Sequence, residues 1–329
     1  MLTDHFRTNA PLHDLGTLDE RWAGIVSPRY DAATVRTYVH EQFLEQAEDY
    51  ARDYLATWYW KGLLEKARVH FTARAQNAER ILDLGSGAGN TVFPLLELFP
   101  GASVVASDLS LPLLKALDRY RQAHFPKRDC YLLQLNAEDG LFEAGQFDLV
   151  AGGAILHHLV APDKAIAQAH AALAPGGTAV FFEPFEAGNQ IIALVLKHLL
   201  AMNASQAERI PEDVTGFFTR YCADFTRRTR AETRAQAFAE LDDKWIFTKG
   251  WVERVARAAG FADVVIHPLH TIDNMCLDQI NTLLRLGPKR PMEVLPGWAI
   301  DHIREVDSQF SPELRSDLLI EGAIVLRKQ

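Results

Sequence analysis

The chain has 329 residues, of which 48% are hydrophobic and 23% are charged, a composition typical of a globular protein with one large domain or a core domain with an insertion. Its formal net charge of −9 argues against a nucleic-acid partner, because a general nucleic-acid surface needs clustered positive charge. The three cysteines are far apart in the sequence, which favours a reducing compartment and gives no zinc site. No apolar leader and no apolar stretch of about 20 residues is visible, so we expect a cytoplasmic protein without a membrane span.

The N-terminal part, residues 1–79, precedes the pattern of a sheet. Residues 1–30 show little periodicity and are expected to form a loosely ordered lead-in. From residue 31 to about 75 the chain becomes helical and aromatic, and the second of two expected helices runs over about 52–69. Aromatic residues at helical spacing usually pack in a core, and the alternative is a helical lid over a ligand site. The aromatic residues that could then reach the ligand are Tyr30, Tyr59 and Trp60.

The core, residues 80–184, begins with the segment Ile81–Asn90, which has the sequence Ile-Leu-Asp-Leu-Gly-Ser-Gly-Ala-Gly-Asn. An apolar run predicts a buried strand, the alternating glycines predict a sharp turn, and the residues after them show a helical pattern. Glycine has no Cβ, so a ligand can lie against the backbone near the free N–H groups of a helix N-terminus. This arrangement indicates a nucleotide-type cofactor site. A dinucleotide fingerprint would need glycine where Asn90 stands, which disfavours a nicotinamide cofactor.

A second strand is expected over residues 102–107 and ends at Asp108, 19 residues after Gly89. In doubly wound folds a carboxylate at this point accepts both ribose hydroxyls of a nucleotide. The alternative is that Asp108 is the N-cap of the next helix, which is expected over 111–124. A third strand over 131–135 follows, and it leads into a polar turn at 136–139.

The fourth strand is expected over 147–151 and runs into Gly152 and Gly153, whose small size allows a ligand to approach the backbone. His157 and His158 follow at the edge where α/β sheets bind ligands. An imidazole with a pKa near 6.5 suits proton removal at neutral pH. Neighbouring residues on a short turn should point in different directions, so at most one histidine faces the reacting atoms. The alternative is that both are structural.

A helix is then expected over residues 161–173, a tight turn over 174–177 and a fifth strand over 178–182. The strand ends at Glu183, which is either a competing base or the partner that orients a histidine. Residues 248–329 complete the sheet around a second insertion at 269–318. That insertion is expected either to pack beside the first one or to form a subunit contact in a homo-oligomer.

The first insertion, residues 185–247, is predicted to be a helical cap on the acceptor side, with helices over 190–202, 211–222 and 227–241. Four arginines in it follow one another at intervals of seven, three and four, which places them on one face of a continuous helix: Arg220, Arg227, Arg230 and Arg234. A charged stripe is usually a solvated face. The alternative is a docking surface for an anionic acceptor that carries a phosphate or carboxylate.

Three motifs together resemble those of class I S-adenosylmethionine-dependent methyltransferases of the small-molecule branch: Asp83-x-Gly-x-Gly-x-Gly, Leu156-His-His-Leu, and Leu173-x-Pro-Gly-Gly before a strand. The resemblance implies a doubly wound α/β fold with a mostly parallel seven-stranded sheet and an antiparallel last strand. It also implies S-adenosylmethionine as the cofactor. The implied cofactor contacts are Asp83, Gly85, Ser86, Gly87, Gly89, Asp108, Leu109, Asn136, Ala137, Glu138, Gly152 and Gly153.

The implied activity is methyl transfer to an oxygen or nitrogen of a small-molecule acceptor, which releases S-adenosylhomocysteine. The cofactor supplies the activated methyl group, so no metal is required, and the candidates for proton removal are His157, His158 and Glu183. Two alternatives stay open. One is a nicotinamide-dependent oxidoreductase, and the other is a protein that keeps the cofactor pocket in a regulatory or non-methylating role.

Overall fold

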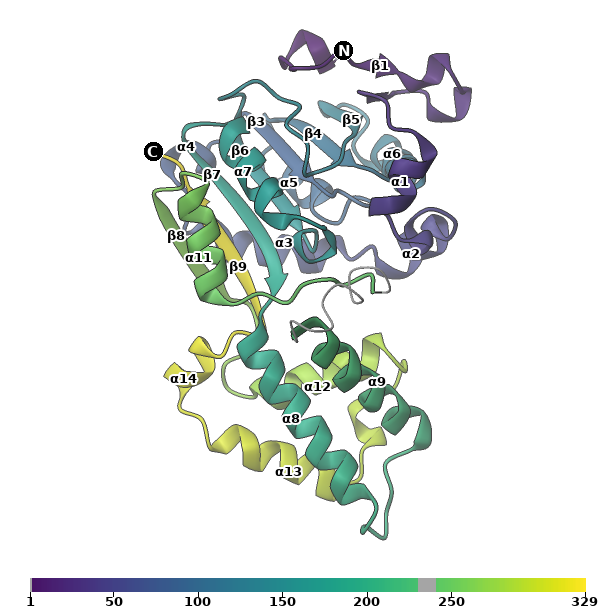
Figure 1. Ribbon diagram of the computed structural model, residues 1–329, viewed down its shortest axis with the longest axis vertical. Coiled ribbons are helices and arrows are strands. Elements are labelled where there is room, and N and C mark those ends of the chain that lie inside the picture. The colour runs from purple at the N-terminus through teal and green to yellow at the C-terminus, as the bar shows by residue number, and fades with distance from the viewer. Residues whose placement is uncertain (1, 230–240) are drawn as a thin grey trace. The chain divides into compact units, whose positions relative to one another are not determined.

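The computed structural model describes residues 2–229 and 241–329 of the chain (Figure 1). The chain divides into two compact units. The first comprises residues 1–183, 250–267 and 323–329, and the second comprises residues 184–249 and 268–322. Among the described helices, none is long and apolar enough to cross a membrane.

The first unit is built on a nine-stranded sheet with the order β1-β2-β5-β4-β3-β6-β7-β9-β8. Its strands are β1 (His13–Asp14), β2 (Ile25–Ser27), β3 (Arg80–Leu84), β4 (Ser103–Asp108), β5 (Cys130–Gln134), β6 (Phe147–Gly153), β7 (Leu173–Pro184), β8 (Asp263–Pro268) and β9 (Glu321–Arg327). The strands from β3 to β7 are parallel. β8 and β9 are antiparallel to each other, because the N–H of Ala262 donates to the carbonyl of Arg327 and the N–H of Leu269 to that of Glu321.

The order of the strands reverses direction at the centre of the sheet. From the central β3 the chain moves to β4 and β5 on one side and then to β6 and β7 on the other. Such a reversal leaves room for a ligand beyond the carboxyl ends of the strands. The strands at the reversal are buried on both faces, with Ile81 and Leu149 fully inaccessible, as expected for a parallel sheet covered by helices.

Two of the nine strands come from the N-terminal segment. β2 pairs in parallel with β5, where Ile25 lies beside Leu132, and β1 pairs antiparallel with β2. Ile25 has no exposed surface, and the ring of the buried Phe6 stacks on Phe147 at 5.0 Å. The predictions of a loosely ordered lead-in and of seven strands are therefore wrong. Apolar side chains secure this segment at the sheet edge, but strands of two and three residues are too short to show a periodic pattern.

The helices of the first unit lie along the faces and edges of this sheet (Figure 1). They are η1 (Leu2–Asp4), η2 (Leu15–Thr17), η3 (Glu20–Trp22), α1 (Ala32–Tyr38), η4 (Glu41–Phe43), α2 (Ala47–Tyr54), α3 (Thr57–Arg68), α4 (Ala73–Gln76), α5 (Val92–Leu98), α6 (Leu111–His124), η5 (Leu156–His158), α7 (Pro162–Ala172) and α11 (Lys249–Ala258). The single helix predicted over 52–69 is interrupted between α2 and α3. At this break the N–H of Ala56 donates to the side-chain oxygen of Asn90 at 2.9 Å.

The predicted tight turn at residues 174–177 is a bulge inside β7. Leu173 pairs with Phe147, whereas Thr178 pairs with Leu149, so the intervening residues of β7 have no matching partners in β6. Gly176 accommodates the bulge with a φ of +76°. β7 therefore begins at Leu173, earlier than the predicted strand.

The second unit is helical. Its elements are α8 (Glu186–Asn203), α9 (Glu212–Thr229), α12 (Met275–Leu286), η7 (Met292–Val294), α13 (Gly297–Ser308) and α14 (Pro312–Asp317). α8 and α9 correspond to the helices predicted over 190–202 and 211–222. The break predicted between 222 and 227 is wrong, because α9 continues to Thr229, and residues 230–240 of the helix predicted over 227–241 lie outside the described residues. One hydrophobic core joins side chains from both insertions, including Leu196, Phe218, Ile280 and Ile303.

Candidate functional site

The turn that follows β3 brings three glycines to the carboxyl edge of the sheet. Gly85, Gly87 and Gly89 have φ values of +66°, +52° and +110°, which residues with a Cβ rarely adopt. A Cβ on Gly85 would collide with Ile155, and one on Gly89 would collide with the ring of Phe93. A Cβ on Gly87 would meet nothing within 4 Å. Gly87 thus presents bare backbone to open space, as a cofactor site requires.

Asp108 lies across from this open backbone, at the end of β4. Its Oδ2 accepts from the N–H of Gly87 at 2.9 Å and its Oδ1 from the N–H of Ser110 at 2.8 Å. The alternative that Asp108 caps α6 is wrong, because the capping hydroxyl is that of Ser110, which accepts from the N–H of Leu113. Burial raises the pKa of Asp108, against the opposing effect of the backbone hydrogen bonds. Each carboxylate oxygen keeps a second lone pair for a ligand hydroxyl. Leu109, the next residue, is buried.

Asp83 supports the glycine turn from beneath. Its side chain is fully buried, and its Oδ2 accepts from the hydroxyl of Thr91 at 2.7 Å. Its backbone carbonyl accepts from the hydroxyls of Ser86 and Ser107. Oδ1 has no hydrogen-bond partner in the part of the chain that the structure describes. Burial raises the pKa of Asp83 to about 7. The predicted contacts of Asp83 and Ser86 with a ligand stay predictions, since both side chains hold the turn itself.

The polar turn after β5 is stabilised by its own side chains. The side-chain oxygen of Asn136 accepts from the N–H of Glu138 at 3.1 Å. Glu138 is buried, and its Oε1 accepts from the N–H groups of Val160 and Ala161, both at 2.9 Å. Ala137 between them is also buried. The amide and the carboxylate that were predicted to flank a ligand thus already bind protein backbone, and their contacts with a ligand stay predictions.

The two glycines that end β6 are covered by protein side chains. A Cβ on Gly152 would lie 2.8 Å from atoms of Ile155 and Phe181, and one on Gly153 would lie 2.6 Å from Trp60. The lack of side chains at these positions therefore lets other parts of the protein pack closely on the backbone. These contacts involve protein side chains alone, and the approach of a ligand to the same glycines stays a prediction.

Two of the three aromatic candidates contact this edge of the sheet. Trp60 packs on the end of β6, as described above. The hydroxyl of Tyr30 accepts from the N–H of Asn136 at 3.2 Å and donates to Oδ2 of Asp139 at 2.8 Å. Tyr59, in contrast, is 41% exposed, and its ring contacts its neighbours on α3. The N-terminal segment therefore reaches the turn after β5 through Tyr30 and the end of β6 through Trp60.

Glu183, near the end of β7, organises the turn that carries the histidines. The residue is 2% exposed, and its side chain has no exposed surface. Oε1 accepts from the N–H groups of Ile155 and Leu156 at 3.1 and 2.7 Å. Oε2 accepts from the N–H of His157 at 3.2 Å and lies 2.6 Å from Nδ1 of the same residue. The carboxylate thus holds η5 by its backbone and contacts the imidazole of His157 directly.

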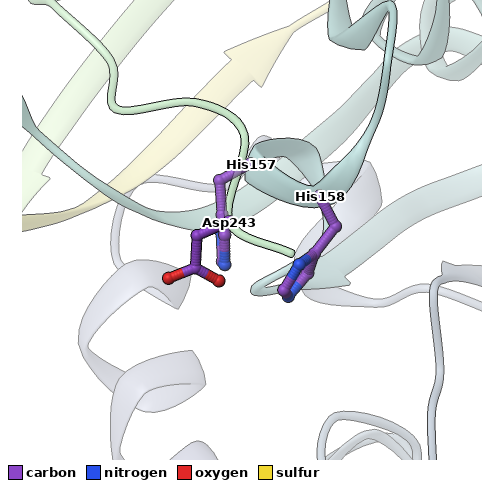
Figure 2. A group of neighbouring side chains, drawn as sticks. All are labelled: His157, His158 and Asp243. Carbon is purple, nitrogen blue, oxygen red and sulfur yellow. The ribbon is translucent and has the colours of Figure 1, made fainter. Parts of the chain in front are cut away.

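His157 and His158 project from η5 toward the same side (Figure 2). Their ring centroids are 4.1 Å apart, with 41° between the ring planes, and the ring of Phe43 meets His158 edge-on at 5.6 Å. The prediction that the two histidines point in different directions is wrong, because the rings pack against each other. Both imidazoles therefore belong to one cluster at the carboxyl edge of the sheet.

The predicted arginine stripe can be followed only in part. Arg220 is exposed on α9, and Arg227 lies 3.7 Å from Asp224 one turn earlier on the same helix. Arg230 and Arg234 lie outside the described residues. A docking surface for an anionic acceptor at these arginines stays a prediction.

Two polar residues of the glycine turn were not predicted to have structural roles. Thr91 is 2% exposed and donates to the carboxyl group of Asp83. Asn90, noted in the sequence only because it is not a glycine, accepts from the N–H of Ala56. Polar side chains just before a buried helix are a signal that could have indicated such roles, although the partners are not evident from spacing.

Comparison with known proteins connects this geometry to one kind of domain. Residues 82–179 match the model of a methyltransferase domain. The chain is 35% identical to the demethylmenaquinone methyltransferase of Thermus thermophilus over 105 residues, which cover 32% of this chain and 47% of that protein. It is 26% identical over 152 residues to the mitochondrial 2-methoxy-6-polyprenyl-1,4-benzoquinol methylase of Caenorhabditis elegans, covering 42% of this chain and 53% of that protein. The chain spans about half the length of the curated relatives it matches.

A solved structure shows the same fold. The phosphoethanolamine N-methyltransferase 2 of Haemonchus contortus, determined in complex with S-adenosyl-L-methionine, superimposes with a TM-score of 0.52. The match covers 89% of this chain and 60% of that protein at 15% sequence identity. At this level of identity the match establishes a likeness of fold.

Proposed function

We propose that this chain, whose residues 82–179 match the model of a methyltransferase domain, is a class I S-adenosylmethionine-dependent methyltransferase that transfers the methyl group of S-adenosylmethionine to a small molecule. The juxtaposition of Gly87 and Asp108 carries this proposal. Gly87 offers bare backbone with open space, and Asp108 offers a carboxylate that accepts from Gly87 and keeps lone pairs for two further donors. The two ribose hydroxyls of the cofactor are donors of the required kind.

The chain's own residues would then position the reactants. S-adenosylmethionine, when bound, supplies a methyl group activated by a sulfonium. Asp108 would hold the ribose, and Gly87 would leave space for the ligand. Holding an acceptor atom in line with the methyl group is worth roughly 7–11 kcal/mol in the best oriented reactions. A hydroxyl or a protonated amine must also lose a proton, and His157 and His158 are the imidazoles that the structure brings to this edge.

The acceptor class is inferred from the charge of the chain and from the relatives. The net charge of −9 disfavours nucleic acid. The names of the relatives and of the solved structure refer to demethylmenaquinone, a benzoquinol and phosphoethanolamine, all of which are small molecules. We therefore propose a small-molecule acceptor. Methylation on oxygen or nitrogen is the expectation from the motif resemblance, and the names of the relatives do not specify the atom that is methylated. Phosphoethanolamine carries a phosphate and a benzoquinol does not. The experiment below therefore compares these two acceptors to determine whether the acceptor is anionic.

The proposal is tested by incubating the protein with S-adenosylmethionine and either phosphoethanolamine or a benzoquinol, and by measuring S-adenosylhomocysteine by chromatography. We expect release of S-adenosylhomocysteine that depends on one of the acceptors. Gly87→Val is the control, because its side chain would enter the open space at a φ of +52°, and we expect it to release none. Tight binding of S-adenosylhomocysteine without turnover of either acceptor would instead favour the non-methylating role.

A further inference from the structure

We propose that Glu183 is a positioning residue for His157: it holds the imidazole proton on Nδ1 and thereby makes Nε2 the atom that accepts a proton. The catalytic part of this inference rests on the proposed function, whereas the position of the proton on His157 does not depend on it. The observation behind it is the set of four contacts that converge on one buried carboxylate.

The hydrogen bonds of Glu183 argue against its acting as the base itself. A carboxylate has about four lone-pair positions, and here three backbone N–H groups and one imidazole nitrogen lie against them. The side chain has no exposed surface. A proton from an acceptor would have to displace one of these contacts before it reached an oxygen of Glu183.

The same contacts define the state of His157. An ionised carboxylate can only accept hydrogen bonds, so at 2.6 Å the hydrogen between Oε2 and Nδ1 belongs to the imidazole. A neutral imidazole that is protonated on Nδ1 has its lone pair on Nε2. The negative charge of Glu183 would also stabilise the imidazolium that forms when Nε2 takes a proton, as the carboxylate does in hydrolase triads.

A purely structural role for Glu183 is the competing explanation, because its carboxylate also fixes the backbone of η5. The two explanations differ in what they require of the side chain. Holding the turn at Ile155 and Leu156 requires an oxygen that accepts from their N–H groups, and a glutamine can supply one. In this orientation glutamine gives up only the longer bond from the N–H of His157, at 3.2 Å. Setting the proton of His157 requires an acceptor at Oε2, where glutamine would place an amide N–H₂ group.

The experiment uses Glu183→Gln and follows the imidazole nitrogens of His157 by ¹⁵N NMR in the full chain with S-adenosylhomocysteine bound. We expect neutral His157 to carry its proton on Nδ1 in the wild type and on Nε2 in the variant, because the amide donates to Nδ1. With the acceptor identified by turnover, kcat should fall about 100-fold or more, while the KM for S-adenosylmethionine stays unchanged. Glu183→Asp, which keeps the charge, should restore the Nδ1 proton and part of kcat.

A double-mutant cycle with His157→Gln separates positioning from structure. If Glu183 acts through His157, then Glu183→Gln lowers kcat no further in the His157→Gln background. A full additional loss in the double variant would overturn the proposal, as would a proton on Nε2 in the wild type. If Glu183→Gln does not fold, the wild type and Glu183→Asp still decide the matter by NMR. A wild type with the expected proton position but no release of S-adenosylhomocysteine would contradict the proposed function alone.

Discussion

The turn after β3 and the turn after β6 each lie over a buried carboxyl group, and the two groups are hydrogen-bonded in contrasting ways. Glu183, beneath the second turn, accepts from three backbone N–H groups and lies against an imidazole. Asp83, beneath the first turn, accepts from the hydroxyl of Thr91, and its Oδ1 has no hydrogen-bond partner among the described residues. Burial by itself therefore does not determine what a carboxyl group does, because the donors around it decide which parts of the protein it holds in place.

The two turns also differ in the space around their glycines. The turn after β3 leaves open space at Gly87, whereas the glycines at the end of β6 are covered by Trp60, Ile155 and Phe181. A glycine in the sequence can thus provide either room for a ligand or close packing of the protein on itself. The first turn is suited to bind a cofactor, and the second is suited to hold side chains in place.

The contrast between the carboxyl groups predicts a pH dependence that is due to Asp83. Its folded pKa of about 7 lies above the usual value of about 3.9, so the folded state favours the neutral form. The stability that Asp83 contributes is complete below pH 3.9 and is lost as the pH rises through about 7, a total of about 4 kcal/mol. Urea unfolding should show that the wild type loses stability relative to Asp83→Asn when the pH is raised from 5 to 8. Parallel pH profiles of the two proteins would contradict this assignment.

The glycine turn itself predicts a difference between two neighbouring substitutions. Gly89→Ala requires a φ of +110° and places its Cβ on the ring of Phe93, so it should cost about 3 kcal/mol of unfolding free energy. Gly87→Ala is the matched control, because it meets no neighbouring atom and has only the strain of a left-handed residue, about 1 kcal/mol. Equal losses in urea unfolding would mean that the space at Gly87 is not open.

Asp108 connects the turn after β3 to the cofactor, so Asp108→Ala should weaken binding of S-adenosylhomocysteine more than tenfold. The reason is the loss of hydrogen bonds to a charged group, which contribute about 1.5–3 kcal/mol each. Asp108→Asn is the control, since it keeps one oxygen for the N–H of Gly87 but loses the charge. Its dissociation constant for S-adenosylhomocysteine should lie between those of the wild type and Asp108→Ala. Equal dissociation constants by calorimetry for wild type and Asp108→Ala would remove Asp108 from the site.

Tyr30→Phe should have the mildest effect. It removes two hydrogen bonds, one accepted from the N–H of Asn136 and one donated to Asp139, which together are worth about 1 kcal/mol because the bond to Asp139 is exposed and contributes little. We therefore expect the unfolding free energy to fall by about that amount in urea, with little change in the affinity for S-adenosylhomocysteine. A large loss of affinity would instead place Tyr30 in direct contact with the ligand.

The features that the sequence predicts well depend on local spacing. The strand and glycine turn at 81–90, the helix over 111–124 and the position of Asp108 all follow from patterns within about 30 residues, and the structure contains each of them. Glu183 was predicted to be either a base or the partner of a histidine, because the ends of adjacent parallel strands meet at one edge of the sheet. The structure places its Oε2 2.6 Å from Nδ1 of His157, and the role of this contact stays a prediction.

The features that could not be predicted depend on contacts between distant residues. The N–H of Ala56 bonds to Asn90, and Glu138 binds the backbone that leads into α7. Spacing carries no information about which backbone group a polar side chain will meet. The strand that contains Ile25 was missed for a related reason, since its place in the sheet is fixed by pairing with β5, which lies far away in the sequence. Of the two side chains that cover Gly152, Ile155 is local, whereas Phe181 comes from the neighbouring strand β7.

The proposal that the turn after β3 binds S-adenosylmethionine is best examined by calorimetric titration of the full chain with S-adenosylhomocysteine and, as a matched ligand, with NAD⁺. The open backbone at Gly87, the carboxylate of Asp108 and the absence of a glycine at position 90 predict saturable binding of S-adenosylhomocysteine and none of NAD⁺. Binding of NAD⁺ without binding of S-adenosylhomocysteine would contradict the proposed function and restore the oxidoreductase alternative.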